Sequence, residues 1–472
     1  MSVHRITVVL GVAGLVLGLV SAQSQAQAPP GARDGIPPVD RSGDAAANAL
    51  RSLYVPGGLS SDRAVKEVIA TSPDMKRTKA LLKEAKGGAM QAMAGLVPQL
   101  DLIGRYTRLS PVDNPTFEIP GIGSLTFPSL TEQTATDATL IYSFTRSLAE
   151  AMPAYRAATK SKIAAQYQIQ AELNDVAFDG RQAYYEYARA EAGLAVANFA
   201  LEAAVSQREE TEALVGAGSA ARVDLMRVQA QDEAARVAVE QAKFGVQVAA
   251  RALQTLMHTE ELPSLGEDLS EEVTGIPTET EKTLLDRAYQ NRPDLRALLE
   301  YIEVTEHQLK SAKGSGAPDL LARGSVQYSN PNLRVVPQRQ RFESTWEVSA
   351  VIQWTPNATV AASGRAHELR AALQQAEADT QLMRDAIRVE VAQGYHGMLA
   401  AQSAIESARL GLAAAREGYR VTREQLQAGI VNTTTLLQAQ TELIRAQVDV
   451  VESAIGIRIA KAQLRRAIGE TP

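Results

Sequence analysis

The hydrophobic positions of this chain repeat with two periods, that of a helix and that of a strand. The ranges 154–262 and 357–471 contain no proline, and apolar residues recur in them in alternating steps of three and four. This spacing is typical of helices that pack as coiled coils. A single helix over 147–215 would extend roughly 100 Å. The pattern therefore predicts long helical rods in an elongated molecule.

The helical pattern occurs twice, and a glycine interrupts it at the same place each time. Gly218 and Gly429 are 211 positions apart, and the apolar seams that follow them match at that offset. The first seam is Leu225, Val228, Asp232, Ala235, Val239, Ala242, Val246, Ala249 and Leu253; the second is Leu436, Ala439, Leu443, Ala446, Val450, Ser453, Ile457, Ala460 and Leu464. Such an internal repeat predicts two copies of one structural unit. We expect an antiparallel helical hairpin in each copy, with its tip at the glycine.

Earlier segments match at a different offset. "TSPDMKR" at 71–77 corresponds to "NRPDLRA" at 291–297, with Pro73 on Pro293, 220 positions apart. The change from 220 to 211 requires nine extra residues in the first copy, between about 109 and 137. We predict a longer loop there.

Four short stretches alternate between apolar and polar residues, as strands with one apolar face do. They lie at 99–110, 134–145, 320–329 and 346–355, two in each copy. Aromatic side chains near both ends of an apolar strip resemble the girdles of outer-membrane barrels. The girdle candidates are Tyr106, Tyr142, Phe144, Tyr328, Trp346 and Trp354.

The strand stretches are long enough to cross a membrane, since a tilted strand needs about 9–11 residues. Four strands cannot close a barrel, and an open edge in lipid leaves unpaired backbone groups that each cost several kcal/mol. We therefore expect the barrel to be shared among copies of the chain. Three copies would supply twelve strands, an even number in the observed range, and four copies would also satisfy closure.

The composition narrows the classes of function. The chain has 472 residues and a formal net charge of -6, so it lacks the basic character of a nucleic-acid binder. It has no cysteine, which excludes disulfides and thiolate chemistry. The N-terminus has an arginine, an apolar run and then small residues, as in a secretory signal peptide cleaved after Ala22 or Ala26. The alternative is an uncleaved anchor helix, for which the run is short.

These features divide the chain into five parts. We interpret 1–22 as the signal peptide and 23–60, rich in proline, glycine, alanine and serine, as an extended N-terminal arm. The two repeats are 61–258 and 282–472. We interpret the acidic segment 259–281 between them as a linker or a small surface domain, in an equatorial region of the molecule.

The sequence shows no catalytic or cofactor-binding motif. It lacks a P-loop, and it lacks G-x-S-x-G and G-x-G-x-x-G in the required context. The histidines are scattered, without a partner at metal-ligand spacing; they are His4, His258, His307, His367 and His396. We therefore predict no enzyme activity, no metal and no cofactor.

Taken in order, these features resemble the TolC family of outer-membrane efflux ducts over about 61–469. The likeness depends on the doubled helix–strand–strand–helix–helix plan, the Pro-Asp pairs, the glycine tips, and Pro98 and Pro318 before strands; "LRRAIGE" at 464–470 adds to it. It implies a mainly α fold with a small β part. Three chains would share a twelve-stranded barrel in the outer membrane, below which long antiparallel helices form a coiled-coil barrel across the periplasm.

The resemblance also implies a function and partners. The trimer would be a passive exit duct for tripartite efflux or type I secretion. Its hairpin tips would face a periplasmic adaptor (a membrane fusion protein) and an inner-membrane transporter. The sequence leaves the cargo open among small toxic molecules, metal ions and polypeptides.

Family members often carry an aspartate six residues after the tip glycine, at the tunnel mouth. This chain has Asp224 there in the first repeat and Thr435 in the second, with Gln438 three residues further on. Because the second repeat has no acid at these positions, the sequence does not predict a strongly cation-selective mouth. Arg222 is a candidate to pair with a neighbouring tip and keep the mouth shut. In the alternative interpretation Asp224 merely caps the following helix.

Two other classes of function are weighed against the duct. A soluble periplasmic coiled-coil scaffold or adaptor without a pore would explain the helices, but it gives no reason for the alternating strands or the paired tryptophans. An exported hydrolase would need a nucleophile and a base, and the sequence offers no such set.

Overall fold

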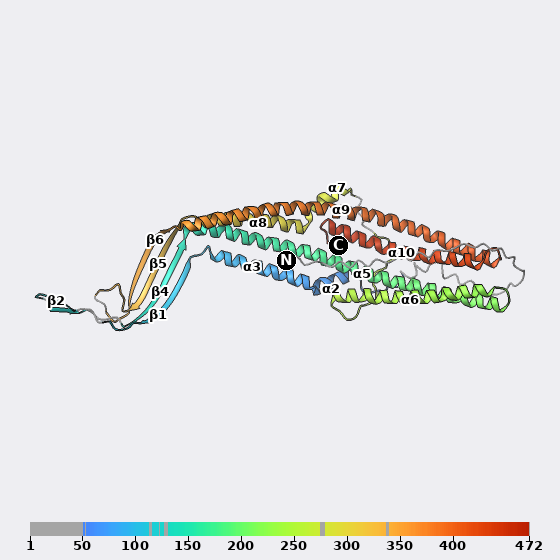
Figure 1. The fold of residues 1–472 in the computed structure, drawn as a ribbon, viewed down its shortest axis with the longest axis horizontal. Coiled ribbons are helices and arrows are strands. Elements are labelled where there is room, and N and C mark those ends of the chain that lie inside the picture. Colours follow the sequence, from blue (N-terminus) through green and yellow to red (C-terminus); the bar gives the residue numbers. More distant parts are fainter. Residues whose placement is uncertain are drawn as a thin grey trace.

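The computed structural model describes residues 51, 53–112, 116–121, 123–126, 131–273, 279–336 and 339–471. They form an elongated molecule with a β-sheet at one end and helical hairpins at the other (Figure 1). This confirms the predicted fold class of long helices with a small antiparallel sheet. The predicted signal peptide and most of the predicted N-terminal arm lie outside the described residues.

Four antiparallel strands form one sheet in the order β1-β4-β5-β6. Their bounds are Gln99–Arg108 (β1), Glu132–Ser143 (β4), Asp319–Asn330 (β5) and Glu343–Gln353 (β6). Val326 on β5 pairs with Ala138 on β4 and with Trp346 on β6, so apolar residues of neighbouring strands share one face. The strands of the two repeats meet where β4 pairs with β5.

The strands differ from the predicted ones at their ends. β4 ends at Ser143, and Phe144 begins the short helix α4 (Phe144–Arg146) instead of ending a strand. β6 ends at Gln353, because Gln353 pairs with Asp319, the first residue of β5, and helix α9 begins at Pro356. Trp354 therefore lies just beyond its strand.

The longer loop predicted in the first repeat is present between β1 and β4. It contains a small hairpin, β2 (Thr116–Ile119) paired with β3 (Gly123–Thr126), that the sequence analysis did not predict. Each strand is four residues long, too short for periodicity to reveal.

Two long helices extend from the sheet to the opposite end of the molecule (Figure 1). They are α5 (Met152–Gly216) in the first repeat and α9 (Pro356–Gln427) in the second. Next to the sheet they are accompanied by α3 (Pro73–Ala94) and α8 (Pro293–Gly314), and at the far end by α6 (Arg222–Met257) and α10 (Thr433–Ala467). Both α8 and α10 pack against α5, so the second repeat is held against the first along most of its length.

The Pro-Asp pairs are helix starts. Each follows a short helix, α2 (Ser61–Thr71) or α7 (Glu281–Asn291). Pro73 and Pro293 are the first residues of α3 and α8, where the missing amide hydrogen costs nothing. The hydroxyl of Ser72 accepts a hydrogen bond of 3.2 Å from an amide of the first turn of α3.

The end of the predicted arm and the predicted linker join near the middle of the molecule. Leu59 and Leu265 form a parallel β-bridge, and the Leu59 amide donates to the Ser264 carbonyl at 2.7 Å. A Cβ on Gly58 would lie 2.4 Å from the Ser264 carbonyl oxygen, so this close approach requires glycine. Leu59 and Leu265 are buried in the main hydrophobic core. Leu265 therefore anchors this part of the linker in the core, while Pro263 and Ser264 beside it are exposed.

The helices meet the sheet at a tightly packed junction. A π-helical turn, Ser147–Ala151, precedes α5, so the α-helical part of the predicted 147–215 rod begins later than expected. Gly314 at the end of α8 lies against this turn. A Cβ on Gly314 would be 1.9 Å from the carbonyl oxygen of Ala149, so no larger residue fits without movement of the backbone.

Candidate functional site

Both helical hairpins end in the same backbone motif, at the end of the molecule far from the sheet. Gly218 has a φ of 76° and Gly429 a φ of 73°. In the first tip the Ser219 amide donates to the Leu214 carbonyl at 2.8 Å, and the Gly218 amide donates to the carbonyl three residues before it at 3.0 Å. The second tip repeats both hydrogen bonds at 2.9 Å. This is the Schellman motif, whose left-handed position favours glycine, so the predicted tip glycines stand at the turns.

The helices that follow the two tips begin differently. The N-cap of α10 is Asn432, whose side-chain oxygen accepts a hydrogen bond of 3.0 Å from the Thr435 amide. The N-cap of α6 is Ala221, which has no side chain that can cap. Asp224 is not the cap of α6 but lies in its first turn. There its negative charge interacts favourably with the helix dipole.

A single arginine links the two tips. Arg227 Nη1 lies 3.3 Å from Asp224 Oδ1 and donates a hydrogen bond of 3.2 Å to Thr434 Oγ1. The sequence analysis missed Arg227, although its spacing of three residues from Asp224 is that of a helical ion pair. The contact with Thr434 joins residues of different repeats, so no pattern in the sequence near Arg227 predicts it.

The other predicted mouth residues, Arg222, Thr435 and Gln438, make no contact between the tips that the structure shows among the described residues; Thr435 donates only to the N-cap Asn432 of its own helix. Arg222 forms no ion pair or hydrogen bond within the described part of the chain. Arg222, Thr435 and Gln438 are exposed. Their role at a tunnel mouth stays a prediction, because it depends on neighbouring copies.

Apolar side chains are also exposed around the tips. Ile430 is 73% exposed and Met226 63% exposed. Val223, in the first turn of α6, is exposed as well. A soluble monomer rarely gathers apolar side chains at one end, and such patches mark interaction sites.

The apolar face of the sheet carries aromatic residues at two levels. Tyr106, Tyr328 and Trp346 lie toward the strand ends far from the helices, on the face defined by the register. Tyr142 lies toward the helical end, and its ring packs edge-on against that of Phe144, with centroids 4.8 Å apart.

Trp354 completes the level next to the helices. Its indole Nε1 donates to Thr359 Oγ1 at 3.1 Å. Val348, on the same face between the two levels, is 74% exposed, so this face is uncovered in one chain. The girdle role of the aromatic residues stays a prediction.

The opposite face of the sheet is mostly polar. Arg105 on β1 forms an ion pair of 3.2 Å with Asp137 on β4. Ser325 on β5 pairs across the strands with Thr139 and with Glu347. The face with Val326 and Trp346 therefore has the character of a surface in contact with lipid, and the opposite face that of a surface in contact with water.

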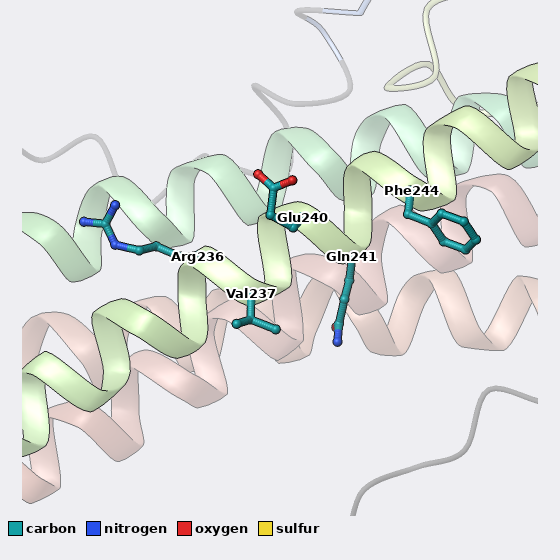
Figure 2. Close-up of a pocket in the computed structure, with 5 residues that line it drawn as sticks. All are labelled: Arg236, Val237, Glu240, Gln241 and Phe244. Carbon is teal, nitrogen blue, oxygen red and sulfur yellow. The ribbon is translucent and has the colours of Figure 1, made fainter.

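A shallow groove of about 460 Å³ lies along α6 (Figure 2). Its lining comes from one helix only: Arg236, Val237, Glu240, Gln241 and Phe244. Phe244 is 68% exposed. The groove has the form of an unpartnered helix face and not of an enclosed ligand site.

Among the described residues, no group of three or more histidine and acidic side chains is placed to hold a metal ion. His396 lies 3.3 Å from Glu281, an isolated contact at the start of α7. None of the described helices is both long and apolar enough to cross a membrane.

The chain combines a four-stranded sheet with one apolar face, long helices, and helical tips with exposed apolar side chains. These features are those of an elongated membrane-protein subunit. The family model of the outer membrane efflux proteins matches residues 64–258 and 284–470. The chain therefore belongs to the outer membrane efflux protein family. The family places it in the outer membrane, with the helical part in the periplasm.

Solved structures of channels share this fold. The Campylobacter jejuni CmeC outer membrane channel superposes with a TM-score of 0.72 at 15% identity, over 87% of this chain and 85% of that one. The outer membrane protein VceC of Vibrio cholerae gives 0.71 at 18% identity, over 87% and 96%. CusC, described with transmembrane channel formation, gives 0.72 at 16% identity, over 89% and 94%. No curated protein matches the chain.

Proposed function

We propose that this protein is the trimeric exit duct of a tripartite efflux or secretion system, coupled to an inner-membrane transporter through a periplasmic adaptor. The observation that carries the proposal is a sheet with two free edges. In the described part of the chain, β1 and β6 have no strand on their outer sides. In lipid such edges would leave backbone amides and carbonyls unpaired, so strands of other copies must complete them.

The internal repeat indicates how the copies would join. Inside the chain, β4 pairs with β5, and α5 packs against both α8 and α10. Replacing each element by its counterpart in the other repeat gives β6 with β1, and α9 with both α3 and α6, between neighbouring copies. In all three contacts, the edge formed by β6 and α9 of one copy meets the edge formed by β1, α3 and α6 of the next. One arrangement of copies would therefore complete the sheet and both helical layers.

Strand direction agrees with this arrangement. The sheet is antiparallel throughout, so β1 and β6 run in opposite directions and β6 would meet the β1 of the next copy antiparallel. With four strands from each copy, three copies supply twelve, an even number as in bacterial barrels of this kind. The choice of three copies over four rests on the family resemblance.

The exposed apolar residues agree as well. On α6, Val237 is 56% and Phe244 is 68% exposed, and both line the groove in Figure 2. On α9, Leu382 is 67% and Leu410 is 74% exposed. These two helices are the ones that the repeat would bring together between copies.

The tips support the coupling to partners. Ile430 and Met226 present apolar side chains at the periplasmic end, where an adaptor would dock. The sequence has no P-loop, so the energy for transport would come from the transporter. The polar face of the sheet would line a passive, water-filled exit.

Two measurements on the full-length protein test the duct. Extracted from membranes in mild detergent, it should have the mass of three chains and give single-channel conductance in planar bilayers. A water-soluble monomer in the periplasmic fraction would instead support the scaffold alternative. Trimers that never conduct would overturn the duct.

A third measurement tests the coupling. A photo-crosslinking residue at Ile430 should capture the adaptor in cells. The matched control is Met90 on α3, which is 75% exposed but lies near the sheet, and it should capture none. Equal capture at both positions would remove the tip as the docking site.

A further inference from the structure

The two helical hairpins have different types of side chain at one pair of facing positions: charged in the first hairpin and uncharged in the second. Asp232 on α6 is 2% exposed, and its Oδ2 lies 3.2 Å from Nε of Arg208 on α5. Arg236 Nη2 donates a hydrogen bond to the same oxygen at 3.2 Å. At the 211-position offset Leu443, 3% exposed, replaces Asp232, and Tyr419 replaces Arg208. An ion pair in the first hairpin thus corresponds to an apolar pair in the second.

The positions around this pair are nearly the same in both hairpins. Because the helices are antiparallel and Asp232 faces Arg208, Ala235 is placed opposite Ala204, and both are buried. Their counterparts in the second repeat are again alanines, Ala446 and Ala415. Because both pairs are alanines, α6 could pack against α9 of the second repeat as well as against its native partner α5. The apolar packing therefore does not distinguish the right partner from the wrong one.

A buried carboxylate does distinguish them, because it is tolerated only opposite a cation. If α6 paired with α9 through this seam, Asp232 would face Tyr419. The carboxylate would keep Arg236 of its own helix but lose the cation on the facing helix. If α10 paired with α5, Leu443 would face Arg208. A shift of α6 by seven residues along α5 would place Asp232 opposite Leu201 or Val215.

We propose that the Asp232–Arg208 pair specifies the partner and register of α6, so that the first hairpin closes on itself and not on the equivalent helix of the second repeat or of another copy. A polar residue at one seam position fixes pairing in this way at a cost in stability. Both alternatives matter here, because every chain supplies two similar hairpins. The proposal rests on the geometry of the hairpins and does not depend on transport.

The absence of cysteine from the chain allows a direct test by engineered disulfides. The pair Ala204→Cys with Ala235→Cys reports the native hairpin. The pair Ala415→Cys with Ala235→Cys reports the buried seam of α6 placed on α9, within one chain or between two. The contact proposed above between neighbouring copies uses a different face of α6, that of Val237 and Phe244, and does not bring these cysteines together. Both pairs are introduced into the full-length protein in three backgrounds, and the disulfide yields are compared on gels after oxidation.

The first background is the unchanged chain, in which the native disulfide should form and the 235–415 disulfide should stay near background. The second is Arg208→Tyr with Asp232→Leu, which copies the second hairpin into the first. Here the 235–415 yield should rise at least tenfold, with helix content by circular dichroism unchanged. The third adds Tyr419→Arg and Leu443→Asp, which moves the ion pair to the other hairpin and should return the 235–415 yield to near background.

A purely structural role of Asp232 predicts no such rescue. If the 235–415 disulfide stays at background in the second background, the pair does not specify the partner and the proposal is overturned. If the second background fails to accumulate, the third decides the matter. Recovery of folded protein and of the native disulfide supports partner specification, and failure to recover contradicts it.

Discussion

Arg227 of the first repeat donates a hydrogen bond of 3.2 Å to Thr434 Oγ1 of the second, and this contact joins the tips of the two helical hairpins. A nearby ion pair of 3.3 Å with Asp224 orients the guanidinium. Exposed contacts of this kind contribute about 1 kcal/mol together. The contact is therefore weak enough to be broken by a docking partner and strong enough to bias the tips toward one arrangement.

Arg227→Ala should loosen the tips. Losing about 1 kcal/mol of contact free energy between the tips would raise the fraction of molecules with separated tips roughly fivefold. The measurement is the open probability of single channels in planar bilayers without partner proteins. Arg251→Ala is the matched control, because Arg251 is an exposed arginine near the other end of α6, far from the tips. Equal effects of the two variants would show that the Arg227 contact does not hold the tips.

Gly429→Val should damage the second tip without affecting assembly. The left-handed φ of 73° is strained for a residue with a Cβ, by about 1–2 kcal/mol, and more for a β-branched one. Gly218→Val should act in the same way on the first tip. Drug susceptibility of cells measures the loss of efflux, and Gly418→Val in the body of α9 is the control. Normal susceptibility at normal expression would count against the tips as the working end.

Gly314→Ala should destabilise the junction between helices and sheet. The added Cβ would lie 1.9 Å from the Ala149 carbonyl oxygen, and overpacking of this kind costs about 1–3 kcal/mol. Gly364→Ala, at an exposed helical position with open space, should raise stability by up to about 1 kcal/mol. Thermal unfolding in detergent compares the two. A Gly314→Ala protein as stable as the parent would mean that the backbone contact relaxes freely.

Val326→Arg should block insertion of the sheet into the membrane. Val326 belongs to the apolar face, where an arginine costs from about 1 kcal/mol near the membrane interfaces to about 2–4 kcal/mol at the bilayer centre. Ser325→Arg is the matched control on the next residue, because Ser325 points to the opposite face and pairs with Glu347. The readout is the amount of folded protein in the outer-membrane fraction. Equal loss for both variants would contradict the assignment of faces.

Tyr185 should make the middle region of the molecule less stable as the pH rises into the alkaline range. Burial, with a further contribution from Glu267, raises the pKa of Tyr185 to about 12, and its hydroxyl donates to Glu267 Oε1 at 2.9 Å. The pKa in the folded state exceeds the unfolded value of about 10. The contribution of Tyr185 is therefore complete below pH 10 and is lost as the pH rises toward 12.

Tyr185→Phe removes this titration. Over the same pH range the variant should lose less unfolding free energy than the parent, by on the order of 2 kcal/mol. Chemical unfolding at several pH values measures the difference. Parallel curves for parent and variant would show that Tyr185 does not titrate with unfolding.

The sequence by itself determined the elements and their repetition. Helix seams, tip glycines and strand faces are encoded within a few consecutive residues, because the 3.6-residue and two-residue periods and the left-handed φ of Gly218 and Gly429 are local requirements. The position of the extra loop also followed from the sequence, since two offsets within one chain differ by its length.

Only the tertiary structure decided which elements meet. The pairing of β4 with β5, the bridge between Leu59 and Leu265 and the hydrogen bond from Arg227 to Thr434 join residues far apart in the chain. The sequence marks Asp232 as an exception in its seam, but only the structure shows Arg208 beside it. Such contacts depend on the packing of whole helices and strands against one another, and no local period carries that information.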